Sequence, residues 1–184
     1  VVKRLGLDYE SLKEVKPDLV MINVTGFGQT GPWRNYGAFA RTIDGYTGLS
    51  HLTGYRGGPP LRANPTYMDT TGGMNNFQAI MMGLFQRDNT GEGIHIDASM
   101  YEAGISAVGP ALLDTQRTGV SEPRPGNRSP VMAPHGCYPC KGDDRWVVVA
   151  VNSDKAWESM CDVMGNPEWT KNPEYNTTDG RIAH

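Results

Sequence analysis

Leu19-Val20-Met21-Ile22-Asn23-Val24 leads directly into Thr25-Gly26-Phe27-Gly28-Gln29-Thr30-Gly31-Pro32, where branched apolar residues give way to glycine. The apolar run lies between Pro17 and Gly26, which predicts a buried strand, and a continuous run of this kind is typical of a parallel sheet. The glycine segment predicts a tight loop at the carboxyl end of that strand, where ligands bind in open α/β sheets. We therefore expect an α/β fold.

Alternating helix and strand patterns continue on both sides of this stretch. Apolar residues recur at spacings of three and four between about 69 and 87, which predicts a long helix that begins at 69–71 and ends at 89–93. The other expected elements of this half are a short helix capped by Asp8, a weak helix over 39–52, a strand over 94–99 and a helix over about 101–117.

A second region follows residues 118–135, a segment rich in proline and glycine that marks the clearest change of composition in the chain. Residues 136–139 and 146–151 predict a β-hairpin. Ser153 is expected to cap a helix that runs to about Met164.

Composition narrows the class of function. Seventeen Lys and Arg face twenty Asp and Glu among 184 residues, so the chain lacks the basic excess of a general nucleic-acid binder. No apolar run approaches the ~20 residues that span a bilayer, and no basic-then-apolar leader is visible, so we expect a cytoplasmic protein without membrane partners. The chain starts without Met and stops in a helical pattern, which suggests a fragment cut at both ends.

The three cysteines do not predict a metal or redox centre. Cys137 and Cys140 have the C-x-x-C spacing, but a turn at 141–144 follows where a redox helix would stand, and no second pair exists. An odd cysteine count also argues against a disulfide framework. We expect no metal site.

Asp69 is the first candidate for chemistry. The first turn of a helix stabilises a carboxylate through its unpaired N–H groups and dipole, and Gly72 and Gly73 would let a ligand approach closely. Such a carboxylate can act as a nucleophile, with nearby N–H groups stabilising an oxyanion. The simpler interpretation is an N-cap, which the residues alone favour.

Other polar residues give weaker signals. His51 on a helix and His95 on a strand are more often structural than catalytic. The glycine loop matches neither a Walker loop nor G-x-G-x-x-G. Solvated charge is the better interpretation for most of the arginines that could serve an anionic ligand, which are Arg4, Arg34, Arg41, Arg56 and Arg62.

Four motifs come in a fixed order along the chain, and the tail 166–181 continues the pattern. They are Thr25–Pro32, Leu52–Pro60, Asp69 with its glycines, and Thr90–Ser99. Together they resemble the class III CoA-transferase family, which includes formyl-CoA:oxalate and carnitine CoA-transferases, over almost the whole chain.

The resemblance implies an architecture. Family members have a Rossmann-like large domain built from both chain ends, a smaller α+β domain between them, and two subunits threaded through each other as interlocked rings. Residues 1–117 would be part of the large domain, residues 118–135 a linker, and residues 136–184 the beginning of the small domain. A homodimer is implied, with heteromeric assembly as the alternative.

The resemblance also implies the chemistry. Asp69 matches the family's catalytic aspartate, through which CoA moves from an acyl-CoA thioester to a free carboxylic acid by way of aspartyl anhydride and aspartyl-CoA thioester intermediates. This reverses the preference for a plain cap. Coenzyme A, as acyl-CoA, is then a substrate, and no tightly bound cofactor is expected.

Cofactor-site residues follow from the same resemblance. Arg4 matches an arginine that contacts the CoA phosphates, work that suits a forked guanidinium. Ala38, Phe39 and Ala40 stand where the family usually carries Gly-Tyr-Asp. The resemblance therefore implies that these three residues also contact CoA, with the aromatic ring retained but without the family's hydroxyl and acid.

The altered stretch 38–40 leaves two alternatives. α-Methylacyl-CoA racemases share the superfamily and the aspartate, but racemisation needs a second acid or base opposite it, and Phe39 cannot exchange a proton. A pairing of Asp69 with His51 would restore that chemistry. The other alternative is an inactive partner subunit of a heteromeric transferase, although the retained Asp69 and its glycines argue against it.

Overall fold

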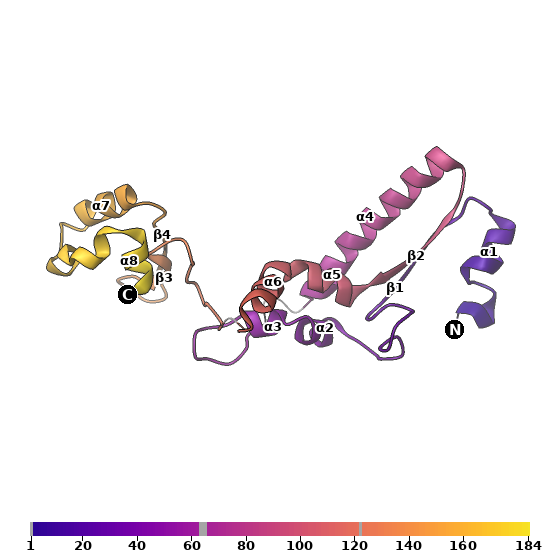
Figure 1. Cartoon of the computed structure of the whole chain (residues 1–184), viewed down its shortest axis with the longest axis horizontal. Coiled ribbons are helices and arrows are strands. Elements are labelled where there is room, and N and C mark those ends of the chain that lie inside the picture. The colour runs from indigo at the N-terminus through magenta and orange to yellow at the C-terminus, as the bar shows by residue number, and fades with distance from the viewer. Residues whose placement is uncertain (1, 63–65, 122) are drawn as a thin grey trace. The chain divides into compact units, whose positions relative to one another are not determined.

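A computed structural model gives the structure of residues 2–62, 66–121 and 123–184 (Figure 1). Within these residues, no helix is both long and apolar enough to cross a membrane.

The chain forms two units. The first unit comprises Val1–Thr53 and Pro60–Pro123, and the second comprises Gly54–Pro59 and Arg124–His184. Each unit combines helices with a two-stranded sheet, so the mixed α/β class is confirmed.

The first unit is built on a parallel pair of strands, β1 (Val20–Thr25) and β2 (Ile94–Ser99). Their register pairs Val20 with Ile94 and confirms the predicted parallel arrangement. The prediction of a buried strand was wrong, because β1 is only half-buried and Val24 is 47% exposed. Each strand has a single hydrogen-bonded neighbour among the described residues, which leaves much of its surface uncovered.

Helix α4 (Tyr67–Thr90) runs alongside the strand pair (Figure 1). Gly83 permits this approach, because a Cβ there would lie 2.9 Å from Val20 Cγ1 and 3.1 Å from Ile94 Cγ2. The long predicted helix is confirmed, but much of its apolar periodicity does not face the core. Its most exposed large apolar residues are Met74, Phe77, Met81, Met82 and Phe85.

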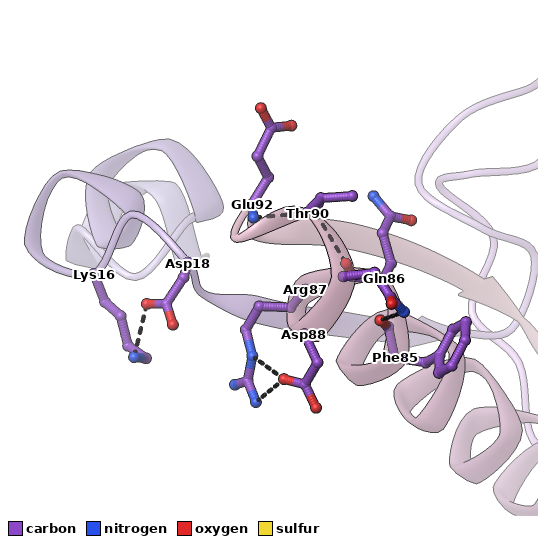
Figure 2. Close-up of polar contacts among 9 residues, drawn as sticks. Lys16, Asp18, Phe85, Gln86, Arg87, Asp88, Thr90 and Glu92 are labelled. Atoms are coloured by element: carbon purple, nitrogen blue, oxygen red, sulfur yellow. Dashed lines mark hydrogen bonds and ion pairs between the residues drawn. The ribbon is translucent and has the colours of Figure 1, made fainter.

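The C-terminal end of α4 lies at the predicted stop signal. Gly91 adopts a left-handed conformation with φ of 73° and donates its N–H to Arg87 O at 2.7 Å. Thr90 Oγ1 donates to Gln86 O at 2.9 Å and accepts from Glu92 N at 3.1 Å (Figure 2). These bonds satisfy carbonyls of the last turn and end the helix.

Two predicted helices are each broken into two. The four segments are α2 (Ala40–Tyr46), α3 (Leu49–Leu52), α5 (Met100–Ala107) and α6 (Gly109–Thr118). Gly48 separates the first pair with a φ of 83°, a left-handed conformation that glycine adopts without steric cost. Val108 separates the second pair two residues before Pro110, which has no N–H to continue the earlier helix.

The N-terminal segment consists of a short 3₁₀ helix (η1, Val2–Leu5) followed by α1 (Tyr9–Val15). Asp8 Oδ1 accepts a hydrogen bond from Ser11 N at 3.4 Å. The predicted cap is therefore confirmed.

The second unit begins with an antiparallel pair, β3 (His135–Pro139) and β4 (Trp146–Ala150), as the hairpin prediction required. Ser153 Oγ then accepts from Ala156 N at 3.2 Å and caps α7 (Asp154–Val163), which confirms the second predicted cap. The remaining elements are η2 (Glu168–Lys171), η3 (Pro173–Asn176) and α8 (Thr178–Ala183).

The core of the second unit consists of Val151, Trp157 and Cys161. Tyr175 packs against this core from η3, and its ring meets that of Trp157 edge-on at 6.4 Å between centroids. A separate buried cluster of Ala40, Ile43 and Met68 forms the core of the first unit.

Candidate active site

Asp69 is the third residue of α4, and the N-cap of that helix is Thr66. The interpretation of Asp69 as an N-cap is therefore wrong. The first helical bond runs from Thr70 N to Thr66 O at 3.0 Å, so the amides before Thr70 precede the helical ladder. Asp69 is exposed, and within the described part of the chain its carboxylate forms no hydrogen bond or ion pair. Because this carboxylate is not engaged in such contacts, it is available to react with a substrate.

A pocket of about 520 Å³ lies beside this carboxylate. It brings Asp69 together with the three-residue stretch that sequence analysis singled out. The residues that line it are Ala38, Phe39, Ala40, Arg41, Thr42, Asp69 and Met100. Three parts of the chain that lie at least 27 residues apart in sequence therefore line one pocket.

The glycine loop fixes one wall of the pocket. A Cβ added at Gly26 would lie 2.4 Å from Ala38 Cβ, so only glycine allows this approach. Phe27 then packs beside the core, where its ring meets those of Trp33 and Tyr46 edge-on. The predicted loop at the carboxyl end of β1 thus contributes to the site by positioning Ala38.

The rest of the pocket is set by the packing of α2 and α5 against the start of α4. Ala40, Ile43 and Met68 form the buried cluster of this unit. Gly104 on α5 closes the junction, because a Cβ there would lie 2.5 Å from Thr47 Cγ2 and 2.8 Å from Met68 Sδ. Since Met68 directly precedes Asp69, this packing fixes the position of the nucleophile candidate.

The other glycines near Asp69 have different roles. Gly72 is buried, and a Cβ there would meet Met100 Cγ at 3.3 Å, so it serves the packing of α4 on α5. A Cβ at Gly73 would meet nothing within 4 Å. Only Gly73 leaves open space of the kind that sequence analysis expected.

Asp44 is the charged residue of this region that sequence analysis missed. It is 2% exposed, and its Oδ1 atom has no hydrogen-bond partner. Burial raises the pKa of its carboxyl, the positive charge of Arg62 lowers it, and the negative charge of Asp69 raises it further. A signal was present, because positions 40, 43, 44 and 47 follow the spacing of one helix face, and all four residues are buried.

The remaining candidates lie elsewhere or are differently engaged. Arg4 is exposed in η1 and is not among the residues that line the pocket. His95 Nε2 lies 2.8 Å from Asn23 Nδ2, and its ring stacks on that of Tyr9 at 5.2 Å. His95 therefore attaches α1 to the sheet, which is the structural role expected of it.

His51 does not line the pocket of Asp69. Its Nε2 lies 3.1 Å from Ser121 Oγ. The arrangement gives no support to an acid–base pair of Asp69 and His51, which the racemase alternative requires.

The cysteines do not converge. Cys137 and Cys140 are exposed on the β3 hairpin, whereas Cys161 is buried in the core of the second unit. Across residues 2–62, 66–121 and 123–184, no three His, Cys, Asp or Glu side chains gather closely enough to hold a metal ion.

Comparisons with known proteins identify the family of this chain. The sequence matches the profile of CoA-transferase family III over residues 1–184. It is 35% identical to an acetyl-CoA:oxalate CoA-transferase of Acetobacter aceti, covering 100% of this chain and 47% of that protein. It is 32% identical to a succinyl-CoA–D-citramalate CoA-transferase of Chloroflexus aurantiacus, covering 97% of this chain and 44% of that protein.

A solved structure supports the fold as well. The crystal structure of a CAIB/BAIF family protein from Brucella suis superposes with a TM-score of 0.88 at 29% identity, covering 99% of this chain and 48% of that one. The chain thus spans about half the length of the relatives it matches. The match over its whole length shows that this chain belongs to CoA-transferase family III.

Proposed function

We propose that this chain is part of an enzyme that moves CoA from an acyl-CoA thioester to a small dicarboxylic acid, with Asp69 as the covalent nucleophile. The observation that carries the proposal is the free carboxylate of Asp69 in the pocket lined by residues 38–42. Oxalate and D-citramalate, the acids in the names of two relatives, each carry two carboxylates, which supports this acceptor class.

The reaction proceeds through four acyl exchanges, at the carbonyls of the donor, of Asp69 and of the acceptor. The Asp69 carboxylate attacks the donor thioester, which gives an aspartyl-acyl anhydride and CoA thiolate. The thiolate attacks the aspartyl carbonyl, which gives an aspartyl-CoA thioester and the donor acid. The acceptor carboxylate then attacks this thioester and displaces the thiolate, and the thiolate finally attacks the acceptor carbonyl, which releases the new acyl-CoA and restores Asp69.

The surroundings of Asp69 suit this chemistry. Backbone N–H groups at the start of α4 can stabilise the oxyanions that form at each exchange. Phe39 is 82% exposed beside the pocket and offers an apolar surface to the acyl-CoA. The open space beside Gly73 would leave room for the bulky thioester.

The complete enzyme extends beyond the present chain in this proposal. We infer that the first unit belongs to a Rossmann-like large domain, with residues 1–117 in it, and that residues 136–184 begin the small domain after a linker at 118–135. The enzyme would be an interlocked dimer of identical subunits in the cytoplasm, and Arg4 would contact the CoA phosphates. No tightly bound cofactor is required by the reaction.

The test replaces the nucleophile in the full-length enzyme. Asp69→Ala is expected to lower the rate of transfer by at least about 10³-fold, because the covalent route is lost, while CoA binding is retained. Asp88→Ala is the matched control on the same helix, since Asp88 pairs with Arg87 at the far end of α4. Its rate should equal that of the wild type.

Trapping provides the second readout. Hydroxylamine added during turnover should convert Asp69 to a hydroxamate, which peptide mass mapping locates. Full activity without any adduct at Asp69 would contradict the mechanism. Uptake of deuterium at the α-carbon of a branched acyl-CoA in heavy water, without an added acid, would instead favour a racemase.

A further inference from the structure

Arg41 is a second charged residue that lines the pocket of Asp69. It is exposed as the second residue of α2 and lines the pocket of about 520 Å³. Within the part of the chain that the structure describes, its guanidinium forms no hydrogen bond and no ion pair. By contrast, Arg34 donates to Gly31 O at 3.1 Å, and Arg117 pairs with Asp114 at 3.0 Å.

The other lining residues make an anion the natural partner of this guanidinium. Ala38, Phe39, Ala40 and Met100 contribute apolar surface. A ligand that fills the pocket displaces water from Arg41, and a desolvated guanidinium needs a charged acceptor to compensate. Asp69 also lines the pocket but forms no ion pair with Arg41, so the cation and the nucleophile remain separate.

We propose that Arg41 binds the second carboxylate of the acceptor acid, the one that does not react. This inference rests on the proposed function and deepens it by naming the residue that selects a dicarboxylic acid over a monocarboxylic acid. A planar guanidinium holds a carboxylate through two parallel hydrogen bonds, which fixes its orientation as well as its position.

The chemistry at Asp69 is compatible with this anchor. One carboxylate oxygen of the acceptor attacks the carbonyl carbon of the Asp69 thioester, the carbon–sulfur bond breaks, and CoA leaves as the thiolate. The second carboxylate stays on Arg41 throughout and changes neither its bonds nor its charge. The thioester form of Asp69 carries no charge, so the doubly charged acid meets one cation and no anion among the residues that line the pocket.

A carboxylate is favoured over a CoA phosphate on grounds of reach. The phosphates of CoA are separated from its sulfur by the whole pantetheine arm. A residue that lines the same pocket as the nucleophile therefore meets the acyl end of the thioester or the acceptor acid. The two sources are distinguished by which substrate's binding suffers when Arg41 is changed.

The experiment measures transfer and binding in the full-length enzyme with Arg41→Gln, Arg41→Lys and the control Arg117→Gln, which removes one arginine from α6. Acetyl-CoA is the donor, and succinate with butyrate, or glutarate with valerate, are the acceptor pairs. Loss of the bidentate contact should raise the KM and the dissociation constant of each diacid by about 10- to 100-fold. The KM of acetyl-CoA and the values for the monoacids should change by less than about 2-fold.

The variants distinguish a carboxylate-binding role of Arg41 from other roles. Arg41→Lys should recover part of the diacid affinity, and Arg117→Gln should match the wild type. An unchanged diacid KM in Arg41→Gln, or a rise confined to acetyl-CoA, would overturn the assignment. Turnover without an adduct at Asp69 would overturn the proposed covalent step instead, and equilibrium binding of succinate against butyrate would still test Arg41.

Discussion

Each unit buries one charged side chain among its described residues, and the two buried charges are treated in opposite ways. Arg181 in the second unit is 8% exposed, whereas Asp44 in the first is 2% exposed, with no hydrogen-bond partner on Oδ1. The Arg181 guanidinium donates to Ala133 O at 2.8 Å, Tyr175 O at 2.7 Å, Asp154 Oδ1 at 2.9 Å and Thr178 Oγ1 at 3.0 Å.

Arg181 holds the second unit together through its hydrogen bonds, whereas the first unit contains Asp44 without such compensation. The acceptors of Arg181 lie on four different segments, and its guanidinium also stacks over Trp157 at 5.3 Å. Asp44 instead lies on the helix that lines the pocket of Asp69 and interacts electrostatically with Asp69 and Arg62. An unsatisfied buried acid costs stability, and proteins retain such groups mainly at functional sites.

The largest expected effect comes from breaking the satisfied charge. Arg181→Met should lower the free energy of unfolding of the second unit by about 3–5 kcal/mol, because four acceptors lose their donor at once. Denaturant unfolding followed by tryptophan fluorescence measures this, since Trp146, Trp157 and Trp169 all lie in that unit.

Arg181→Lys is the matched control for that experiment. It keeps the charge but loses the planar fork, so its stability should lie between that of Arg181→Met and the wild type. If Arg181→Met unfolds at the wild-type denaturant concentration, the bonds of Arg181 do not stabilise the unit, and the comparison fails.

The next effect tests the packing that holds the junction of the first unit. Gly104→Ala would force a methyl group against Thr47 and Met68, and overpacking of this kind costs about 1–3 kcal/mol. Because Met68 precedes Asp69, the proposed transfer activity of the full-length enzyme should fall together with stability. Gly109→Ala is the control, since a Cβ there meets nothing within 4 Å. Equal losses in both variants would show that the junction is not tightly packed.

The sequence predicted the junction only in part, for reasons that particular residues make clear. The periodicity of α4 and the glycines after Asp69 are local signals, and they identified the helix that carries the nucleophile candidate. Whether an apolar residue is covered depends on tertiary neighbours, so the exposure of Phe77 and Met81 could not be read from spacing. A single acid in a weak helical pattern reads as a solvated residue, which is why Asp44 was missed.

The sequence also did not predict where long helical patterns break into two helices. The stretch 39–52 has helical spacing, and only the left-handed conformation of Gly48 divides it. The stretch 38–40 was identified by family resemblance, not by periodicity. In the structure it lines the same pocket as Asp69. Segments far apart in sequence meet through packing that local patterns do not encode.

A smaller effect tests whether the buried carboxylate of Asp44 lowers the free energy of unfolding. Burial raises the pKa of the Asp44 carboxyl above the value of an aspartate in the unfolded chain, which is about 3.9. The stability that its proton confers is complete below the unfolded value and is lost as pH rises through the folded value. Asp44→Asn cannot lose a proton, so it should be more stable than the wild type at neutral pH, by on the order of 1 kcal/mol.

The measurement compares unfolding of Asp44→Asn and the wild type at several pH values. The difference in stability should grow as pH rises across that window and then level off. Asp88→Asn, on the exposed end of α4, should show no such growth. A constant difference at all pH values would mean that Asp44 does not titrate in the folded protein over that range.

The smallest expected effect concerns Asp154 in the second unit, whose pKa is shifted in the direction opposite to that of Asp44. Hydrogen bonds from Thr178 and then Arg181 lower the pKa of Asp154. Its contribution to stability is therefore present above about pH 3.9, the pKa of an aspartate in the unfolded chain, and is lost as pH falls through the folded value.

The measurement is cleavage by pepsin at increasing acidity, which should attack the second unit of the wild type first. Asp154→Asn should remove that acid sensitivity. Glu158→Gln, on the same helix, is the control and should retain it. Because Asp44 gains stability in the first unit as Asp154 loses it in the second, the two units should respond to acid in opposite directions. Parallel loss in both units would mean that Asp44 and Asp154 do not affect stability in opposite directions.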